Sequence, residues 1–328
     1  MVAVEPLVTR LPTPFAPWHV NGYLFAERPV TIFDPGPLVP STLPVWERTL
    51  DDAGLVFADV EQIVLSHQHW DHLGAAELLR EATGASVLAP AAVEPYARHF
   101  VRAMDIEVAF YAELMRAHGV PGEHAAKALE VFAALPAYVG STGLDRALLE
   151  GERFRAGENE LTVLARPGHS PTDTVFVDHD GRTALVGDHV LGAYPSVIMP
   201  PVAAPPVTHE ALLCAGAATM IASLRDTAAL GLTLALPGHG EAIEDVAGTV
   251  ARALDYYRRH DRKVLELLDS GPARAWDLVL ARDAGVRGED ALYKLASTLG
   301  SLELLIADGL VVAERTPAGP RFLRSDRR

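Results

Sequence analysis

Three histidines and an aspartate fall within six consecutive positions of this chain. The stretch Ser66–His72 reads Ser-His-Gln-His-Trp-Asp-His and directly follows the apolar run Val60–Leu65. Imidazole and carboxylate groups are the ligands that zinc and similar divalent metals prefer. At the end of an extended strand, residues two apart face the same way, so His67 and His69 can bind one ion. The aspartate and the third histidine lie beyond that pair and point toward a second ion.

Three further candidate ligands, His169, Asp188 and His239, each follow a predicted strand. A single histidine after a strand is more often a hydrogen-bonded structural residue. Together with the first motif, however, they make five histidines and two aspartates at strand ends, enough for two coordination spheres that share one carboxylate. Functional groups at strand ends are typical of layered α/β folds. The strands that precede them are Leu161–Leu164, Thr183–Val186 and Leu232–Leu236.

The first ninety residues are predicted to form strands and helices in alternation. The turn Asp34-Pro35-Gly36-Pro37 stops the strands that precede it. Gly84 is placed to end a helix. The predicted elements are the strands Gly22–Phe25 and Val30–Phe33, the helix Leu43–Ala53, the strand Val60–Leu65 and the helix Gly74–Thr83.

Residues 91–149 are predicted to form a helical insertion, because large apolar residues recur there at helical spacing. Pro121-Gly122 divides it into two helical pieces. The apolar face either packs the insertion onto the core or shapes a pocket as a lid, and the two interpretations are compatible.

Residues 251–328 are predicted to form a separate domain whose element order, two helices and a hairpin after a leading helix, is that of a winged helix. The second helix carries one charged residue, Lys294, in the stretch 293–302, so DNA binding is disfavoured and packing or dimerisation is expected. The predicted elements are the helices Ala251–Leu268, Ala275–Arg282 and Asp290–Ile306 and the strands Leu310–Glu314 and Arg321–Leu323.

Length and composition fit a catalytic domain of residues 1–250 followed by this small domain. The chain has 328 residues, of which 49% are hydrophobic, so it can bury a sizeable core. The first residues do not resemble a signal peptide, and no apolar run of about 18 residues is present, so we expect no membrane association. The single cysteine, Cys214, is expected to be a buried structural thiol and favours a cytoplasmic location.

Charge disfavours a nucleic-acid substrate. The net charge is −15, and residues 256–328 contribute 13 basic and 11 acidic side chains, which leaves −17 for residues 1–255. A surface this acidic repels a phosphate backbone.

The motif and the three later ligands resemble the metallo-β-lactamase superfamily over about residues 20–245. The resemblance implies an α/β fold, an αββα sandwich of two mixed sheets with helices outside and the metals at one edge. It also implies that two divalent ions are bound, with zinc expected and iron or manganese as alternatives. Asp188 would bridge the two ions. The first ion would be held by His67, His69 and His169, and the second by Asp71, His72 and His239.

Two divalent ions about 3.5–4 Å apart can hold a water and lower its pKa to roughly 7, so the expected reaction is hydrolysis by a metal-bound hydroxide. Asp71 would orient that hydroxide as well as bind metal. Tyr194 could donate a hydrogen bond to the oxyanion, although a packed tyrosine is the simpler interpretation. Asp34 either supports a ligand histidine or merely forms a turn. The other histidines, among them His19 and His118, are treated as structural or solvent-facing.

Within the superfamily, the residues favour some branches over others. The commonest β-lactamases have arginine at the position of His72 and cysteine at that of Asp188, and the diiron oxygen reductases have glutamate at that of His69. Three branches remain: glyoxalase II-like and related thioester hydrolases, a group with a winged-helix-like C-terminus that includes acyl-carrier thioesterases and an endoribonuclease, and lactonases or phosphodiesterases.

Our hypothesis is a dinuclear hydrolase that cleaves a thioester or ester of a small substrate with an apolar acyl part. The rival hypothesis is a nucleic-acid-binding regulatory protein that uses its C-terminal domain. A single-iron dioxygenase and a homodimer are left open.

Overall fold

A computed structural model describes residues 5–203 and 206–325 of the chain. These residues form two compact units, and each is described here by itself. Unit 1 contains the residues up to Val101 together with Leu135–Ser196 and Ser223–Val250. Unit 2 contains Arg102–Ala134, Val197–Ala222 and the residues from Ala251 onward.

Unit 1 contains two mixed β-sheets. The first has the strand order β1-β2-β3-β4-β5-β6, in which β1, β2 and β3 pair antiparallel and β3 to β6 pair parallel. Its strands are β1 (Leu7–Pro12), β2 (His19–Phe25), β3 (Thr31–Phe33), β4 (Gln62–Val64), β5 (Ser86–Pro90) and β6 (Arg146–Leu148).

The second sheet has the order β11-β10-β9-β8-β7. Its strands pair antiparallel except for β10 and β11, which are parallel. Parallel pairing places the ends of β10 and β11 side by side, and a candidate ligand follows each of them. The strands are β7 (Arg153–Ala156), β8 (Asn159–Ala165), β9 (Thr174–Asp178), β10 (Thr183–Gly187) and β11 (Leu234–Pro237).

The core of unit 1 lies between the two sheets. Phe33 of β3 contacts Phe176 of β9 edge to face, with ring centroids 5.2 Å apart, and Phe154 of β7 packs beside both. Residues from both sheets share this cluster, including Val64, just before the histidine motif. The interlocked apolar faces therefore fix the strand ends that carry the site.

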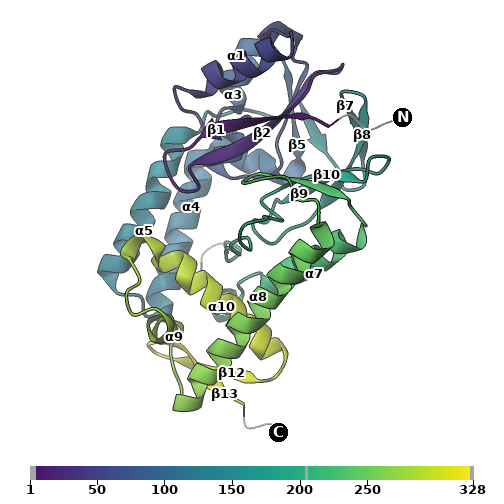
Figure 1. Cartoon of the computed structure of the whole chain (residues 1–328). Coiled ribbons are helices and arrows are strands. Elements are labelled where there is room, and N and C mark those ends of the chain that lie inside the picture. The colour runs from purple at the N-terminus through teal and green to yellow at the C-terminus, as the bar shows by residue number, and fades with distance from the viewer. Residues whose placement is uncertain (1–4, 204–205, 326–328) are drawn as a thin grey trace. The chain divides into compact units, whose positions relative to one another are not determined.

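Helices pack against the first sheet, and one helix is bonded to a loop that follows a strand of the second. Helices α1 (Thr42–Asp52) and α3 (Ala76–Thr83) contact the first sheet (Figure 1). Helix α1 buries Trp46 and Leu50 four positions apart, as an amphipathic helix on a sheet requires. On the second sheet, the part of α7 (Ala217–Ala229) from Ser223 onward is bonded to the loop after β10 through Thr227. The predicted αββα fold class is confirmed.

Unit 2 is mostly helical. Helix α4 (Glu94–His118) is kinked at His99, whose φ and ψ of −136° and 43° are not helical. It enters unit 2 at Arg102. The remaining elements are α5 (Gly122–Ala134), α6 (His209–Leu213), the first part of α7, α8 (Val246–Leu267) from Ala251 onward, α9 (Ala275–Arg282), α10 (Ala291–Ala307), β12 (Val311–Thr316) and β13 (Gly319–Arg324). The short helices of the two units are α2 (Trp70–Leu73), η1 (Phe57–Asp59), η2 (Ala91–Val93), η3 (Leu135–Tyr138), η4 (Leu268–Ser270) and η5 (Gly288–Asp290).

The helices predicted for the insertion are present, and part of the insertion groups with the C-terminal residues in unit 2. Phe132 of α5 packs against Tyr293 of α10, with ring centroids 6.1 Å apart. The element order of two helices and a hairpin is present in α9, α10, β12 and β13, while its winged-helix character stays a prediction. The prediction for Cys214 is wrong: it is exposed, because α6 ends there and leaves the side chain on the surface. Among the described residues, no helix is long and apolar enough to cross a membrane.

His118, at the end of α4, predicts a pH-dependent stability of unit 2. The side chain is 0% exposed, and its Nε2–H donates to the Leu212 carbonyl at 2.9 Å. Burial, together with the positive charges of Arg274 and His209, lowers the pKa of His118 to about 4, although the bond to Leu212 opposes this. In the unfolded chain the pKa of His118 is about 6.5. Between about pH 6.5 and about pH 4 the unfolded state therefore binds more protons at this residue than the folded state does.

We expect protonation of His118 to contribute a fall of about 3 kcal/mol in the free energy of unfolding as the pH drops from about 6.5 to 4. His118→Gln keeps the donor to Leu212 but cannot be protonated in this range, so the fall should shrink. Urea denaturation at a series of pH values measures this, with the exposed His179→Gln as control. An unchanged pH dependence in His118→Gln would contradict the assignment.

Candidate metal centre

The predicted ligands all lie in unit 1, in the loops and the short helix that follow its strands. The chain leaves β4 at Val64, and helix α2 begins at Trp70, directly after His69. Asp71 and His72 therefore lie in the first turn of α2, at the end of the motif that is farther from β4 in the sequence. The other three candidates come from the second sheet: His169 lies between β8 and β9, Asp188 follows β10, and His239 follows β11.

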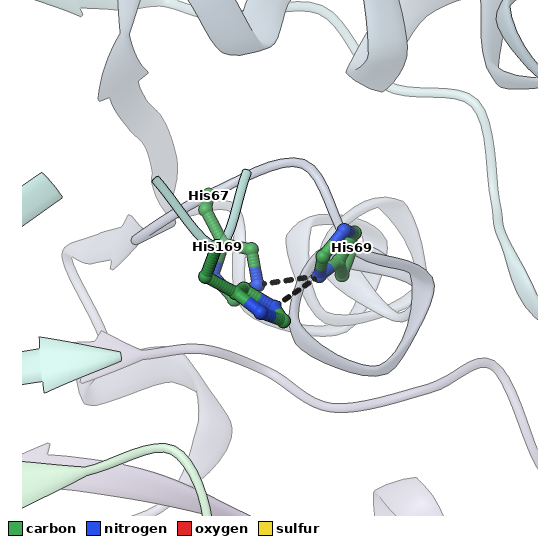
Figure 2. A group of neighbouring side chains, drawn as sticks. All are labelled: His67, His69 and His169. Atoms are coloured by element: carbon green, nitrogen blue, oxygen red, sulfur yellow. Dashed lines mark hydrogen bonds between the residues drawn. The ribbon is translucent and has the colours of Figure 1, made fainter. Parts of the chain in front are cut away.

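The first group consists of three imidazoles turned toward one another (Figure 2). Nδ1 of His69 lies 3.0 Å from Nε2 of His67 and 2.9 Å from Nε2 of His169. A ring nitrogen can make only one such hydrogen bond, so the arrangement cannot satisfy all three nitrogens at once. A cation that accepts three lone pairs can.

The second group consists of Asp71, His72 and His239. Nε2 of His239 lies 3.3 Å from a carboxylate oxygen of Asp71 and 3.3 Å from Oδ2 of Asp188. Asp188 lies between the groups, because the same oxygen is 3.6 Å from Nε2 of His169. All seven residues predicted to bind metal are thus brought together.

Asp34 determines which nitrogen of His72 faces this centre. The carboxylate of Asp34 accepts hydrogen bonds from Ser66 N at 2.8 Å, Ser66 Oγ at 2.7 Å and Nδ1–H of His72 at 2.8 Å. Nδ1 of His72 is therefore protonated, and Nε2 is directed at Asp188. Of the two interpretations of Asp34, support of a ligand histidine is the one seen in the geometry.

Ser66 determines the tautomer of His67 in the same way. Its hydroxyl hydrogen is donated to Asp34, which as a carboxylate can only accept. Ser66 Oγ therefore accepts from Nδ1–H of His67, 2.9 Å away, and Nε2 of His67 keeps its lone pair toward the centre. The backbone of His19 determines the tautomer of His239 in the same way. Nδ1–H of His239 donates to the His19 carbonyl at 2.7 Å, which leaves Nε2 toward the centre.

Two atoms at the centre are buried without a hydrogen bond. They are Nε2 of His72 and Oδ1 of Asp188, which lie 3.4 Å apart. An unsatisfied buried polar atom costs about 1–3 kcal/mol, so such atoms normally have a partner. A nitrogen and a carboxylate oxygen directed into one space are the donor set of a divalent ion.

The pKa values divide the histidines into two classes. Burial, followed by the charges of neighbouring histidines, keeps the pKa of His67 well below its usual range and lowers that of His69 to about 3. Both are therefore neutral, which is the form that binds metal. Burial opposes protonation of His72 and His239 as well. The carboxylates outweigh it, Asp188 foremost, and raise the two pKa values to about 10 and about 12.

Asp188 shows the complementary effect. Burial disfavours its ionised form, but His239 and His72 outweigh burial and hold the pKa of Asp188 well below its usual range. Without metal, positive imidazoles balance the carboxylates of this group. A cation that binds here takes their place, so its binding must release protons.

Gly238, just before His239, keeps the loop close to the centre. A Cβ at this position would overlap the carboxylate of Asp188 and come within 2.5 Å of the His72 ring. Only glycine lets the backbone pass there.

Tyr194, the second predicted catalytic residue, is 45% exposed, so it is not a packed core tyrosine. Burial of its inner part raises the pKa of Tyr194, and His239, Asp188 and Asp71 also act on it. The phenol is therefore within electrostatic reach of the second group.

Two contributors were missed in the sequence. Ser66 precedes the motif directly, and that position was the available signal. The His19 contribution comes from a backbone carbonyl, which no sequence pattern marks.

Comparison with known proteins places this site in a family. The family model described as the metallo-beta-lactamase superfamily matches residues 16–239. The chain belongs to this superfamily. It is therefore a metal-dependent hydrolase, and the fold of such hydrolases implies divalent metal ions.

Curated relatives and solved structures resemble the chain. The probable metallo-hydrolase YqjP of Bacillus subtilis is 26% identical over 95% of this chain and 96% of its own length. A hydroxyacylglutathione hydrolase of Cereibacter sphaeroides is 31% identical over 40% of this chain and 34% of its own length. The thioesterase pkgB of Emericella nidulans is 26% identical over 38% of this chain and 32% of its own length. The metallo-beta-lactamase family protein TTHA1429 from Thermus thermophilus superposes with a TM-score of 0.78 at 26% identity, covering 98% of both chains.

Proposed function

We propose that this metallo-β-lactamase superfamily hydrolase binds two divalent ions, zinc in the first instance, and cleaves a thioester or ester of a small acyl substrate. Three imidazoles would hold the first ion: those of His67, His69 and His169. Asp71, His72 and His239 would hold the second, and Asp188 would contribute to both. The main support is the tautomer control described above, by which Asp34, Ser66 and the His19 carbonyl leave ring nitrogens available at the centre.

When bound, the two ions polarise the scissile carbonyl and lower the pKa of a water to about 7. The residues of the chain supply the rest. A carboxylate oxygen of Asp71 accepts a hydrogen bond from the attacking water and orients it. The Tyr194 hydroxyl donates to the carbonyl oxygen as negative charge develops there. A thiolate can leave without a strong general acid, which favours a thioester over an amide.

Charge and relatives support a small acyl substrate. Residues 1–255 carry a net charge of −17, which opposes a phosphate backbone. The thioesterase and hydroxyacylglutathione hydrolase relatives act on acyl thioesters by their names, although this chain spans about a third of their length. Lactones, phosphodiesters and RNA are the alternative substrates.

The nucleic-acid-binding alternative has less support. Helix α10, the second helix of the proposed winged helix, buries most of its residues within unit 2, including Leu295 and Leu299. A helix buried in this way has little surface for a DNA groove. We propose instead that residues 251–328 serve packing or formation of a homodimer. The single, exposed Cys214 suits a reducing compartment, and we propose the cytoplasm.

A substrate screen tests the proposed function. Protein loaded with zinc, iron or manganese is assayed against acyl thioesters, lactones, phosphodiesters and single-stranded RNA. We expect turnover of thioesters or esters that disappears with a chelator and returns with metal. Turnover of RNA alone would contradict the proposal, and one iron per chain with oxygen consumption would indicate a dioxygenase.

Tyr194→Phe tests the proposed oxyanion contact. Because the phenol is partly exposed and water can replace it, we expect kcat to fall about tenfold, less than the loss of a buried oxyanion donor. Metal content should not change. The control is Tyr256→Phe, an exposed tyrosine of unit 2, and equal kcat in both variants would exclude the contact.

A further inference from the structure

Three aromatic side chains of unit 1 form a cluster outside the core. The ring centroids of Phe15, Trp70 and Tyr138 lie 5.4–5.7 Å from one another. Phe15 meets the other two rings edge to face, at 79° and 88°. All three side chains are partly exposed, in contrast to the fully enclosed rings between the sheets, such as Phe33. We call the three residues the aromatic wall.

The loop that carries Phe15 has a defined shape. The hydroxyl of Thr13 lies 2.7 Å from the Phe15 carbonyl and 2.6 Å from the Pro17 carbonyl, and the backbone N–H of Thr13 donates to the Trp18 carbonyl at 3.1 Å. These contacts close the loop between β1 and β2 on itself. Phe15 is therefore held in place by its own loop. Trp18 projects from the same loop and is 69% exposed.

Each member of the wall is tied to the metal centre through the backbone. Trp70 lies between two proposed ligands, His69 and Asp71, and is the first residue of α2. The loop of Phe15 ends at His19, whose carbonyl orients His239. Tyr138 ends η3, which contacts α2, and the backbone beyond it bonds to that of Gly74 at 2.8 Å.

We propose that the aromatic wall is the subsite for the apolar acyl group of the substrate. This inference rests on the proposed function, because the acyl group that it places is part of the substrate proposed above. The three rings keep part of their surface exposed, and Trp70 lies in the chain directly between the proposed ligands His69 and Asp71. Aromatic surface held rigidly in this way binds an apolar or aromatic group at little cost in conformational entropy. The wall selects phenyl or longer alkyl groups over a methyl group.

Binding of inert probes tests the inference without turnover. The probes are S-benzyl- and S-methyl-N-acetylcysteamine, thioethers that carry no scissile thioester, titrated calorimetrically into metal-replete full-length protein. We expect the benzyl probe to bind more tightly than the methyl probe. Phe15→Ala and Tyr138→Ala should each weaken the benzyl probe about 2- to 10-fold, since one aromatic contact contributes about 0.5–1.5 kcal/mol. Both variants should bind the methyl probe as the parent does.

Tyr256→Ala, an exposed aromatic residue of unit 2, is the matched control. Metal content and melting temperature are measured for each variant, and the two wall variants come from different elements, so misfolding of one leaves the other informative. Equal binding of the two probes by the parent, or unchanged benzyl binding in both wall variants, would overturn the inference.

The outcomes separate this inference from the proposed reaction. Benzyl selectivity that depends on the wall, in a protein without thioester or ester turnover, supports the subsite and rejects the reaction. Turnover of thioesters with no such selectivity supports the reaction and rejects the subsite.

Discussion

Asp188→Ala is expected to lose at least one metal ion per chain and nearly all turnover. The Asp188 carboxylate lies within 3.6 Å of ring nitrogens from both ligand groups, so its side chain is placed to hold both ions. Its loss also removes the negative charge that balances His72 and His239. We expect kcat/KM to fall by more than about 100-fold, beyond the 10- to 100-fold loss typical of an outer hydrogen-bond partner.

The matched control is Asp178→Asn, which changes another buried carboxylate of the second sheet. Asp178 accepts from the Asn159 side chain at 2.8 Å and is not part of the metal centre. The metal content and kcat/KM of both variants are measured to test whether Asp188 holds the ions. Retention of two ions and full rate in Asp188→Ala would show that the assignment is wrong.

Asp34→Asn is expected to weaken metal binding about 10- to 100-fold without removing a ligand. Asp34 accepts three hydrogen bonds, two from Ser66 and one from His72, and an asparagine cannot accept all of them. Its backbone has a φ of 51°, which asparagine adopts more readily than most residues, so the turn should survive. Nε2 of His72 would then no longer be fixed toward Asp188 and the centre.

Ser66→Ala gives a graded comparison. It removes the contact to His67 but leaves His72 bonded to Asp34, so it should affect mainly the first ion. Competition with a chelator measures the affinity of each ion, and the exposed Asp51→Asn is the control. Equal affinities in Asp34→Asn and the parent would contradict the positioning role of Asp34.

The parts of this molecule that follow local rules could be predicted from the sequence. The motif from His67 to His72 lies between strand β4 and the first turn of helix α2, and its spacing indicates two directions of binding. His169, Asp188 and His239 became candidates because each follows a predicted strand, and the resemblance to the superfamily implied their roles as ligands. Helix α9 has the bounds predicted for it, since its apolar spacing and the flanking Gly271-Pro272 are local signals.

Features that depend on distant contacts could not be predicted. The sequence predicts one insertion over residues 91–149, made of two helical pieces, yet the chain divides between Val101 and Arg102 into two compact units, because long-range packing decides which residues belong together. The bond from His239 to the His19 carbonyl joins residues 220 positions apart. The aromatic wall likewise joins Phe15, Trp70 and Tyr138 from three separate segments.

Crystals of the zinc-loaded protein, with anomalous scattering measured at the zinc edge, test the central claim most directly. The account predicts two peaks about 3.5–4 Å apart. One should lie among His67, His69 and His169, the other among Asp71, His72 and His239, with Asp188 touching both. A protein that takes up no zinc at saturation, or binds it away from these residues, would contradict the account.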